Sequence, residues 1–307
     1  MTLHIRTPLF ESVPISRHTG KSVFLKMECF QPAGSFKIRG IGQLCEQHVS
    51  SGKSSLISSS GGNAGYAVAY SGRNLGAKVT VIVPETTSEE VCQQIRIEGA
   101  EVKIHGSVWD ESHEYAFNLA EKINGAYIHP FDHPGIWKGH STIVDELAEQ
   151  CVQKPDAVVL SVGGGGLLCG IAEGMERNGW TDVPVIAVET EGAASLGASV
   201  KKGKLISLEK VTSIATTLGA KQVASKAFDY ARTLNVTPVT VTDSFAVDAC
   251  LRFSYDHRVL VEPACGASLS AVYNCADIIR YAGTVVVIVC GGTGVSIEKL
   301  LQWQKMK

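Results

Sequence analysis

Short apolar runs alternate with amphipathic stretches from about residue 54 to the end of the chain, and this alternation restricts the fold more than any other feature. Strands of a parallel sheet need long crossover connections, which are usually helices. The pattern therefore predicts an α/β fold with two open, largely parallel twisted sheets flanked by helices. The predicted strands are 55–59, 79–83, 101–104, 157–162, 183–189 and 284–290, and the predicted helices are 66–74, 88–99, 137–150 and 167–175.

Two domains are expected, because 307 residues exceed one average domain. The segment 126–135 contains two prolines and is interpreted as a crossing between domains. We expect a small domain at 31–133 and a large domain that combines 1–30 with 134–307, with the active-site cleft between them.

Composition excludes several classes of function. The formal charge of -2 and the pI near 6.5 provide no basic surface for nucleic acid. No apolar run has the roughly 20 residues that span a bilayer, and the first residues lack the apolar core of a signal peptide. The nine cysteines include no CxxC pair, and Cys169, Cys250 and Cys275 lie in apolar sequence. This usage favours free thiols and a cytoplasmic protein.

Four consecutive glycines, Gly163, Gly164, Gly165 and Gly166, separate the strand that ends at Val162 from a predicted helix. Such a turn lets backbone N–H groups converge on a phosphate at a helix N-terminus. The spacing matches neither the dinucleotide fingerprint nor the Walker loop, so a single small phosphate fits better. The alternative is that the glycines only allow a helix to pack closely on the sheet.

Lys37 is the candidate nucleophile, because it follows a turn at 31–34 that is expected to open a helix. A deprotonated lysine amine forms a Schiff base with a carbonyl group. The simpler alternative is a surface lysine in an ordinary helix. Together, this lysine, the glycine run and the asparagine loop at 60–65 are the parts needed to hold pyridoxal phosphate.

The chain resembles the fold-type II pyridoxal-phosphate enzymes, which share the fold of the tryptophan synthase β chain, and among them the L-serine/L-threonine dehydratases. The resemblance runs from Thr7 to Gly294 and rests on six motifs in order. They are G-S-F-K-x-R-G at 34–40, S-G-G-N-A-G at 60–65, P-F-D-x-P at 130–134, S-V-G-G-G-G-L at 161–167, V-E-P-A-C-G-A at 261–267 and V-C-G-G at 289–292.

The resemblance implies a role for each motif. Lys37 holds the cofactor and later removes the Cα proton, Phe36 stacks on the cofactor ring, and Asn63 donates to its 3-oxygen. Cys290, followed by Gly291, lies against the pyridine nitrogen, where a neutral thiol does not keep that nitrogen protonated. The other cofactor ligands are Gly163, Gly164, Gly165, Gly166 and Leu167, and the substrate carboxylate is bound by Ser60, Gly61, Gly62, Asn63 and Ala64.

A monovalent cation, expected to be potassium, is also implied by the resemblance. Its ligands are the Glu189 side chain and the backbone carbonyls of Gly163, Ala193, Leu218 and Ala220. The alternative is that Glu189 is simply an acid at the end of a strand. A metal site at His129 and His133 is rejected, because a proline breaks their spacing and no third ligand lies nearby.

The expected activity is deamination of L-serine, and of L-threonine, to the 2-oxo acid and ammonia in amino-acid catabolism, with a homodimer implied by the resemblance. One alternative is a serine racemase or a β-replacing synthase on the same fold. Another is a non-catalytic vitamin-carrying or interaction protein, since fold does not fix function. Racemases of this fold carry serine where this chain has Gly61, and glycine has no side chain to transfer a proton.

Overall fold

The structure is a computed structural model that describes residues 2–274 and 276–306. These residues form two compact units, each made of two stretches of sequence. Unit 1 comprises Met1–Ile5 and Gln31–His140, and unit 2 comprises Arg6–Phe30 and Ser141–Lys307. The division between His140 and Ser141 falls within helix α6 (Pro134–Gln150), a few residues beyond the expected domain boundary at 133/134.

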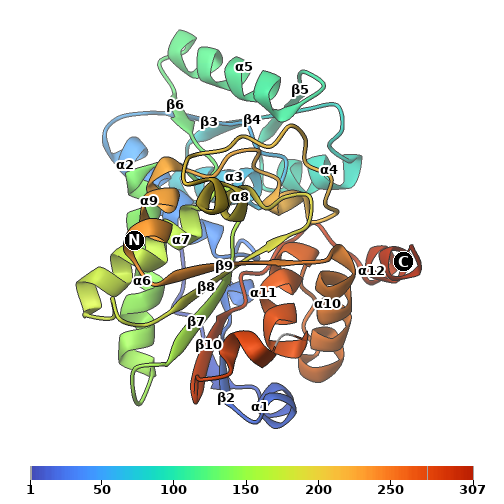
Figure 1. The fold of residues 1–307 in the computed structure, drawn as a ribbon. Coiled ribbons are helices and arrows are strands. Elements are labelled where there is room, and N and C mark those ends of the chain that lie inside the picture. The colour runs from blue at the N-terminus through green and yellow to red at the C-terminus, as the bar shows by residue number, and fades with distance from the viewer. Residues whose placement is uncertain (1, 275, 307) are drawn as a thin grey trace. The chain divides into compact units, whose positions relative to one another are not determined.

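Unit 1 contains a four-stranded sheet in the order β5-β4-β3-β6, with every pair of neighbouring strands parallel. Figure 1 shows α5 on one face of this sheet and α2, α3 and α4 on the other. The elements are α2 (Lys37–Ser50), β3 (Ser55–Ser58), α3 (Asn63–Leu75), β4 (Lys78–Val83), α4 (Glu89–Ile97), β5 (Glu101–Ile104), α5 (Trp109–Lys122) and β6 (Ala126–Ile128).

Alternating side chains of the central strands fill two cores in unit 1. Leu56, Val81 and Val83 pack in the core on the side of α2, α3 and α4. Ile57 and Ile82 point to the other face, where they pack against two alanines of α5. Because successive strand residues face opposite sides, a nearly continuous apolar run is what a sheet covered on both faces requires.

Unit 2 contains a six-stranded sheet in the order β1-β2-β10-β7-β8-β9. Only the β1–β2 pair is antiparallel; the other neighbouring strands in this sheet pair in parallel. The strands are β1 (Leu9–Glu11), β2 (Ser22–Lys26), β7 (Ala157–Ser161), β8 (Val185–Thr190), β9 (Val236–Val241) and β10 (Thr284–Ile288). β7 and β8 are buried along their whole length, as strands between two layers of helices must be.

The helices of unit 2 lie in the chain between these strands, except α12, which follows β10 (Figure 1). The α-helices are α1 (Val13–Thr19), α7 (Gly166–Asn178), α8 (Ser195–Lys202), α9 (Ser225–Thr233), α10 (Asp243–His257), α11 (Pro263–Asn274) and α12 (Ile297–Lys305), together with the part of α6 that follows His140. Short 3-10 turns occur at Glu28–Phe30, Thr216–Leu218 and Ala276–Ile279.

The predicted class of fold and all six predicted strands are confirmed, with shifts of one or two residues at their ends. The segment 126–135 differs from its interpretation as a crossing, because Ala126–Ile128 forms β6 and pairs with β3. Three residues are too few to display an alternating pattern. The sequence alone therefore does not identify this strand, which is recognised by its pairing with β3.

The cysteines of the described residues are free thiols, and Cys169 and Cys250 are buried as their apolar sequence indicates. Cys275 lies outside the described residues. Within residues 2–274 and 276–306, no helix combines the length and the apolar character needed to cross a membrane.

Candidate active site

The turn before Lys37 forms as the sequence predicts. Gly34 has a φ of 69°, a left-handed conformation that favours glycine, and its N–H donates to the Gln31 carbonyl at 2.7 Å. Gln31 itself is anchored, because its side-chain amide exchanges two hydrogen bonds with the backbone of Ile5. Helix α2 then begins at Lys37. The turn thereby places the lysine in the first turn of a helix.

Lys37 lies among groups that are held neutral. Its Nζ donates to the Pro130 carbonyl at 2.8 Å. Burial, with a smaller contribution from the neighbouring charge of Lys37, lowers the pKa of His129 to about 3 and the pKa of His140 well below its ordinary value. The two histidines near the lysine amine, His129 and His140, are therefore uncharged at neutral pH.

Phe36 packs against His140, with ring centroids 4.8 Å apart and planes at 58°. His140 is completely buried, and neither of its ring nitrogens has a hydrogen-bond partner. A neutral imidazole in such a place acts as an aromatic surface that fixes the Phe36 ring.

The Ser60–Ala64 loop follows β3 and runs into the first turn of helix α3, which begins at Asn63. Ser60 accepts a hydrogen bond from the Gly62 N–H at 3.3 Å. Gly65 must be glycine, because a Cβ there would overlap the Ser60 carbonyl. No side chain caps the start of α3, so the loop and the helix terminus together form a place suited to an anion such as a carboxylate.

Gly61 lies in close contact with the loop after β4. A Cβ added to Gly61 would lie 2.8 Å from Thr87 Cγ2, 3.0 Å from Thr87 Oγ1 and 3.3 Å from a Val83 methyl group. A larger residue at this position therefore requires Thr87 to move. Sequence analysis identified Gly61 but gave no indication of this neighbour.

In unit 2, the glycine run forms the predicted strand-to-helix turn between β7 and α7. Gly165 has a φ of 88°, and a Cβ there would lie 2.5 Å from the Ala227 Cβ. Gly164 accepts a hydrogen bond from the Ala224 N–H at 3.0 Å. The loop is thus packed against the start of α9, and no side chain caps the N-terminus of α7. This arrangement suits a phosphate group.

Cys290 is buried two residues beyond the end of β10. A hydrogen bond with Cys265, and burial, raise its pKa well above the ordinary value, so the thiol is neutral. Gly291 and Gly292 follow with positive φ, and a Cβ on Gly292 would overlap the carboxylate of Glu262. Sequence analysis quoted Glu262 and Cys265 in a motif but assigned them no role, since only the fold brings them to the end of β10.

Glu189 is buried near the end of β8, and its carboxylate accepts hydrogen bonds from the N–H groups of Leu196 and Gly197 at 2.8 and 2.7 Å. Burial nevertheless raises its pKa to about 7. Gly163 lies against the Leu218 backbone, where a Cβ would be 2.8 Å from the Leu218 Cα. Of the predicted cation ligands, Glu189, Ala193 and Leu218 are buried, and Gly163 and Ala220 are partly buried.

The His129–His133 segment makes local hydrogen bonds with its own backbone. Nδ1 of His129 accepts from the N–H groups of Phe131 and Asp132, and Nδ1 of His133 accepts from Gly135. These contacts stabilise the turn that precedes α6.

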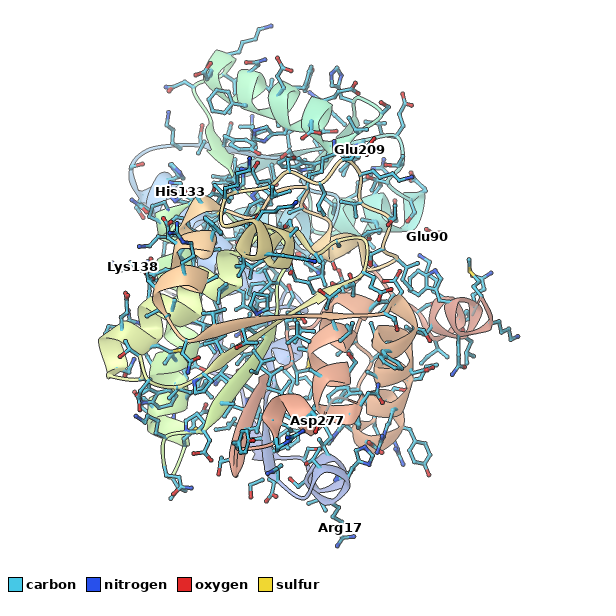
Figure 2. The ribbon with its side chains drawn as sticks, viewed as in Figure 1. Arg17, Glu90, His133, Lys138, Glu209 and Asp277 are labelled. Carbon is cyan, nitrogen blue, oxygen red and sulfur yellow. The ribbon has the colours of Figure 1, made fainter. Side chains whose placement is uncertain are left out.

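A groove of about 550 Å³ lies on unit 1 beside α2 and the start of α6. Figure 2 labels His133 and Lys138, two of the residues that line it. It contains none of the predicted site residues, and its lining of glutamine, glutamate, serine and lysine side chains forms no recognisable set of ligands.

The predicted site residues therefore fall into two groups, one in each unit. Unit 1 holds Phe36, Lys37 and the Ser60–Ala64 loop, on two helices that pack against each other. Unit 2 holds the glycine loop, Glu189 and Cys290. The first group contains an amine and a loop that leads into a helix N-terminus, and the second contains a glycine turn at a helix N-terminus and a neutral thiol.

Comparisons with known proteins agree with this chemistry. Residues 1–291 match the family model "Pyridoxal-phosphate dependent enzyme". The human L-serine dehydratase/L-threonine deaminase is 46% identical over 97% of this chain and 94% of its own length, and the mouse serine dehydratase-like protein is 47% identical over 97% and 93%. The crystal structure of a fungal L-serine ammonia-lyase from Rhizomucor miehei superposes with a TM-score of 0.95 at 40% identity, covering 99% of both chains. The chain therefore belongs to the pyridoxal-phosphate-dependent enzymes and, within them, to the family of the L-serine dehydratases and serine dehydratase-like proteins.

Proposed function

We propose that the protein is an L-serine ammonia-lyase that also accepts L-threonine, and that it converts them by α,β-elimination to pyruvate or 2-oxobutanoate and ammonia in amino-acid catabolism. The observation that carries this proposal is the setting of Lys37: a single amine at a helix start, hydrogen-bonded to the Pro130 carbonyl, with the neutral imidazoles of His129 and His140 nearby. Full-length similarity to proteins named for this reaction supports it.

The residues of both units fit the cofactor of the family. When bound, pyridoxal phosphate supplies an electron-withdrawing ring that stabilises negative charge at the substrate Cα. Lys37 would hold the cofactor through its Nζ and would accept the proton that the substrate Cα loses. Phe36, kept in place by His140, packs against the ring. Asn63 donates to the 3-oxygen.

In unit 2, the glycine loop and Cys290 are the residues assigned to the cofactor. The backbone N–H groups of Gly163–Leu167 hold its phosphate, aided by the N-terminus of α7. Cys290, with its adjoining Gly291, contacts the pyridine nitrogen as a neutral thiol, which neither gives up a proton nor stabilises a pyridinium. Beside such a thiol, the bound ring would be a weaker electron sink than beside a carboxylate.

The Ser60–Ala64 loop binds the substrate carboxylate, for which the start of α3, where no side chain caps the helix, is suited. Glu189 and the carbonyls of Gly163, Ala193, Leu218 and Ala220 bind potassium. The buried Glu189 carboxylate, whose pKa of about 7 reflects the lack of a compensating charge, supports a cation there, and its oxygens suit a hard ion.

Free thiols throughout the described residues support a cytoplasmic enzyme. We further propose a homodimer. Light scattering of the purified protein measures its mass and distinguishes a dimer from a monomer.

Borohydride reduction tests the central assignment. The purified protein is expected to be yellow, and reduction followed by peptide mapping should place the pyridoxyl group on Lys37. L-serine should yield pyruvate, L-threonine should yield 2-oxobutanoate, and Lys37→Ala should abolish both reactions while retaining the circular dichroism of the wild type. A label on another lysine, or an active Lys37→Ala variant, would overturn the proposal.

A further inference from the structure

A chain of two hydrogen bonds in unit 1 leads from helix α5 to the residue before the substrate-binding loop. The Ser59 hydroxyl lies 2.7 Å from the Tyr127 hydroxyl, and the Tyr127 hydroxyl lies 2.6 Å from Nδ1 of His113. Ser59 is completely buried and directly precedes Ser60, whereas His113 is only partly buried. These hydrogen bonds therefore connect a solvent-accessible histidine with the buried residue that precedes the loop.

Aromatic packing holds the His113 imidazole in place. Trp109 stacks on His113 with ring centroids 4.8 Å apart and planes at 24°. The edge of Tyr127 meets the same imidazole at 5.2 Å, and His129 meets it at 5.7 Å. Trp109 and His113 are four residues apart and therefore share one face of α5. The geometry of the Tyr127–His113 hydrogen bond is thus fixed by its surroundings.

The direction of donation along the chain depends on the charge of His113. Burial lowers the pKa of His113 and raises the pKa of Tyr127 to about 12, so both are neutral at pH 7. A phenol is a stronger donor than a neutral imidazole, so Tyr127 donates to Nδ1, and Ser59 donates to Tyr127. When His113 gains a proton, Nδ1 becomes a donor, Tyr127 donates to Ser59, and the Ser59 proton must find another acceptor.

Several charged or titratable groups face His113. Asp110 and Glu114 on its own helix favour its protonated form. Tyr127 and His129 face it from β6 and the turn that follows. From β3 and β4, the residues that pack on α5 are the apolar Ile57 and Ile82, with Ser59 reached through Tyr127. The two carboxylates favour protonation of His113, and burial, the larger effect, opposes it, so that its pKa lies below the ordinary value.

We propose that His113 and Tyr127 are positioning residues of the substrate-binding loop, which fix the Ser59 hydroxyl in one orientation when His113 is neutral and release it when His113 is protonated. This inference rests on the proposed function, because it assigns the affected loop to the substrate carboxylate. Protonation of His113 therefore weakens substrate binding, so the KM for L-serine rises as the pH falls. The proton transfer at Lys37 does not involve His113 or Tyr127.

Steady-state kinetics between pH 5.5 and 8.0 test the proposal with matched variants. In the wild type, the KM for L-serine should rise about three- to tenfold more on acidification than in His113→Asn, since one neutral hydrogen bond is at stake. Asparagine places an amide near the position of Nδ1 but does not titrate. Tyr127→Phe should raise KM at every pH. It should also lack the additional rise of KM that the wild type shows on acidification. His105→Asn, which removes a histidine stacked on Tyr115 in the same unit, should behave as the wild type.

Tryptophan fluorescence provides a second measurement that does not depend on activity. A protonated imidazole stacked on an indole quenches its emission, so the wild type should lose fluorescence on acidification, and His113→Asn and Trp109→Phe should both lose this change. His113→Phe, compared by thermal melting, shows whether the packing alone accounts for any defect. Wild-type and His113→Asn enzymes with the same pH dependence of KM would overturn the inference.

The two proposals fail in different ways. A wild type that forms no pyruvate from L-serine at any pH overturns the proposed function and the substrate role of the loop with it. An active wild type with an unaltered His113→Asn profile overturns only the role of His113 and Tyr127.

Discussion

Gly61 decides at the scale of one residue which proton transfers this site permits. Racemisation needs a second acid/base group on the side of Cα opposite Lys37, and glycine offers none. We expect Gly61→Ser alone to bind substrate poorly, because its Cβ would lie 2.8 Å from Thr87 Cγ2. The double variant Gly61→Ser/Thr87→Ala relieves this contact and should form measurable D-serine.

Chiral chromatography of reactions started from L-serine measures that outcome. Gly61→Ala/Thr87→Ala is the matched control, since it has the same Cβ and no hydroxyl, and it should form none. D-serine produced by the wild type at a rate comparable to pyruvate would falsify the dehydratase assignment and favour a racemase.

Glu189 gives a second prediction at this scale. Burial raises its pKa from 4.5 to about 7, which corresponds to about 3 kcal/mol. Since the folded pKa lies above the unfolded one, this group's contribution to stability is fully present below pH 4.5 and is lost as the pH rises to about 7. In the absence of potassium, the wild-type Tm should therefore fall between pH 5 and 7.5 more than that of Glu189→Gln.

Potassium should offset this loss in the wild type, because a bound cation stabilises the carboxylate. Thermal melting in potassium and in tetramethylammonium chloride compares the two conditions, and catalytic rates in the same salts should follow the same order. A Glu189→Gln variant that gains as much from potassium as the wild type would remove Glu189 from the cation site.

Helix α7 shows at the scale of an element how its two ends differ. Gly165 at its start and Gly179 at its end both have positive φ, 88° and 70°. A Cβ on Gly165 would lie 2.5 Å from Ala227 and 2.7 Å from Val223, whereas nothing lies within 4 Å of one on Gly179. The strain of a left-handed alanine is thus common to both sites, and the steric conflict belongs to the phosphate loop alone.

Gly165→Ala should therefore lose more stability than Gly179→Ala, by about 1–3 kcal/mol, and it should release pyridoxal phosphate faster. Urea unfolding and the decay of cofactor absorbance after dilution measure the two effects. Equal losses in both variants would mean that the loop has room for a side chain and is not a close-fitting cradle.

At the scale of the whole molecule, strands far apart in the chain support one another. β2, near the N-terminus, pairs with β10, near the C-terminus, so that Leu25 lies opposite Val287. Leu25 is completely buried, whereas Phe10 on the edge strand β1 is 37% exposed. Neither segment of unit 2 completes this sheet alone.

Leu25→Ala should cost about 2–5 kcal/mol of stability and should accelerate hydrogen exchange in β10. Phe10→Ala, a control on the neighbouring strand, should have a much smaller effect, since its side chain already contacts solvent. Denaturant unfolding and amide exchange by mass spectrometry measure both. Unchanged exchange in β10 of Leu25→Ala would show that the pairing contributes little.

Local features were predictable because their causes are local. The turn at Gln31–Gly34, the helix after Lys37 and the glycine loop before α7 each depend on backbone preferences and hydrogen bonds among neighbouring residues. The buried strands β7 and β10 are nearly continuous apolar runs, so the sequence pattern alone predicts them. The sequence does not predict strand β6, because its three residues are too few to show an alternating apolar pattern.

The sequence by itself determined the class of fold through its alternation along the chain, and the turn before Lys37, the glycine turn and the family through short motifs, each with its own chemistry. Only the tertiary structure decided which distant groups meet: Thr87 against Gly61, Glu262 beside Gly292, Cys265 with Cys290, and Ser59 with Tyr127 and His113. These pairs come from separate elements, and their contacts depend on strand order and helix packing, which leave no trace in residue spacing.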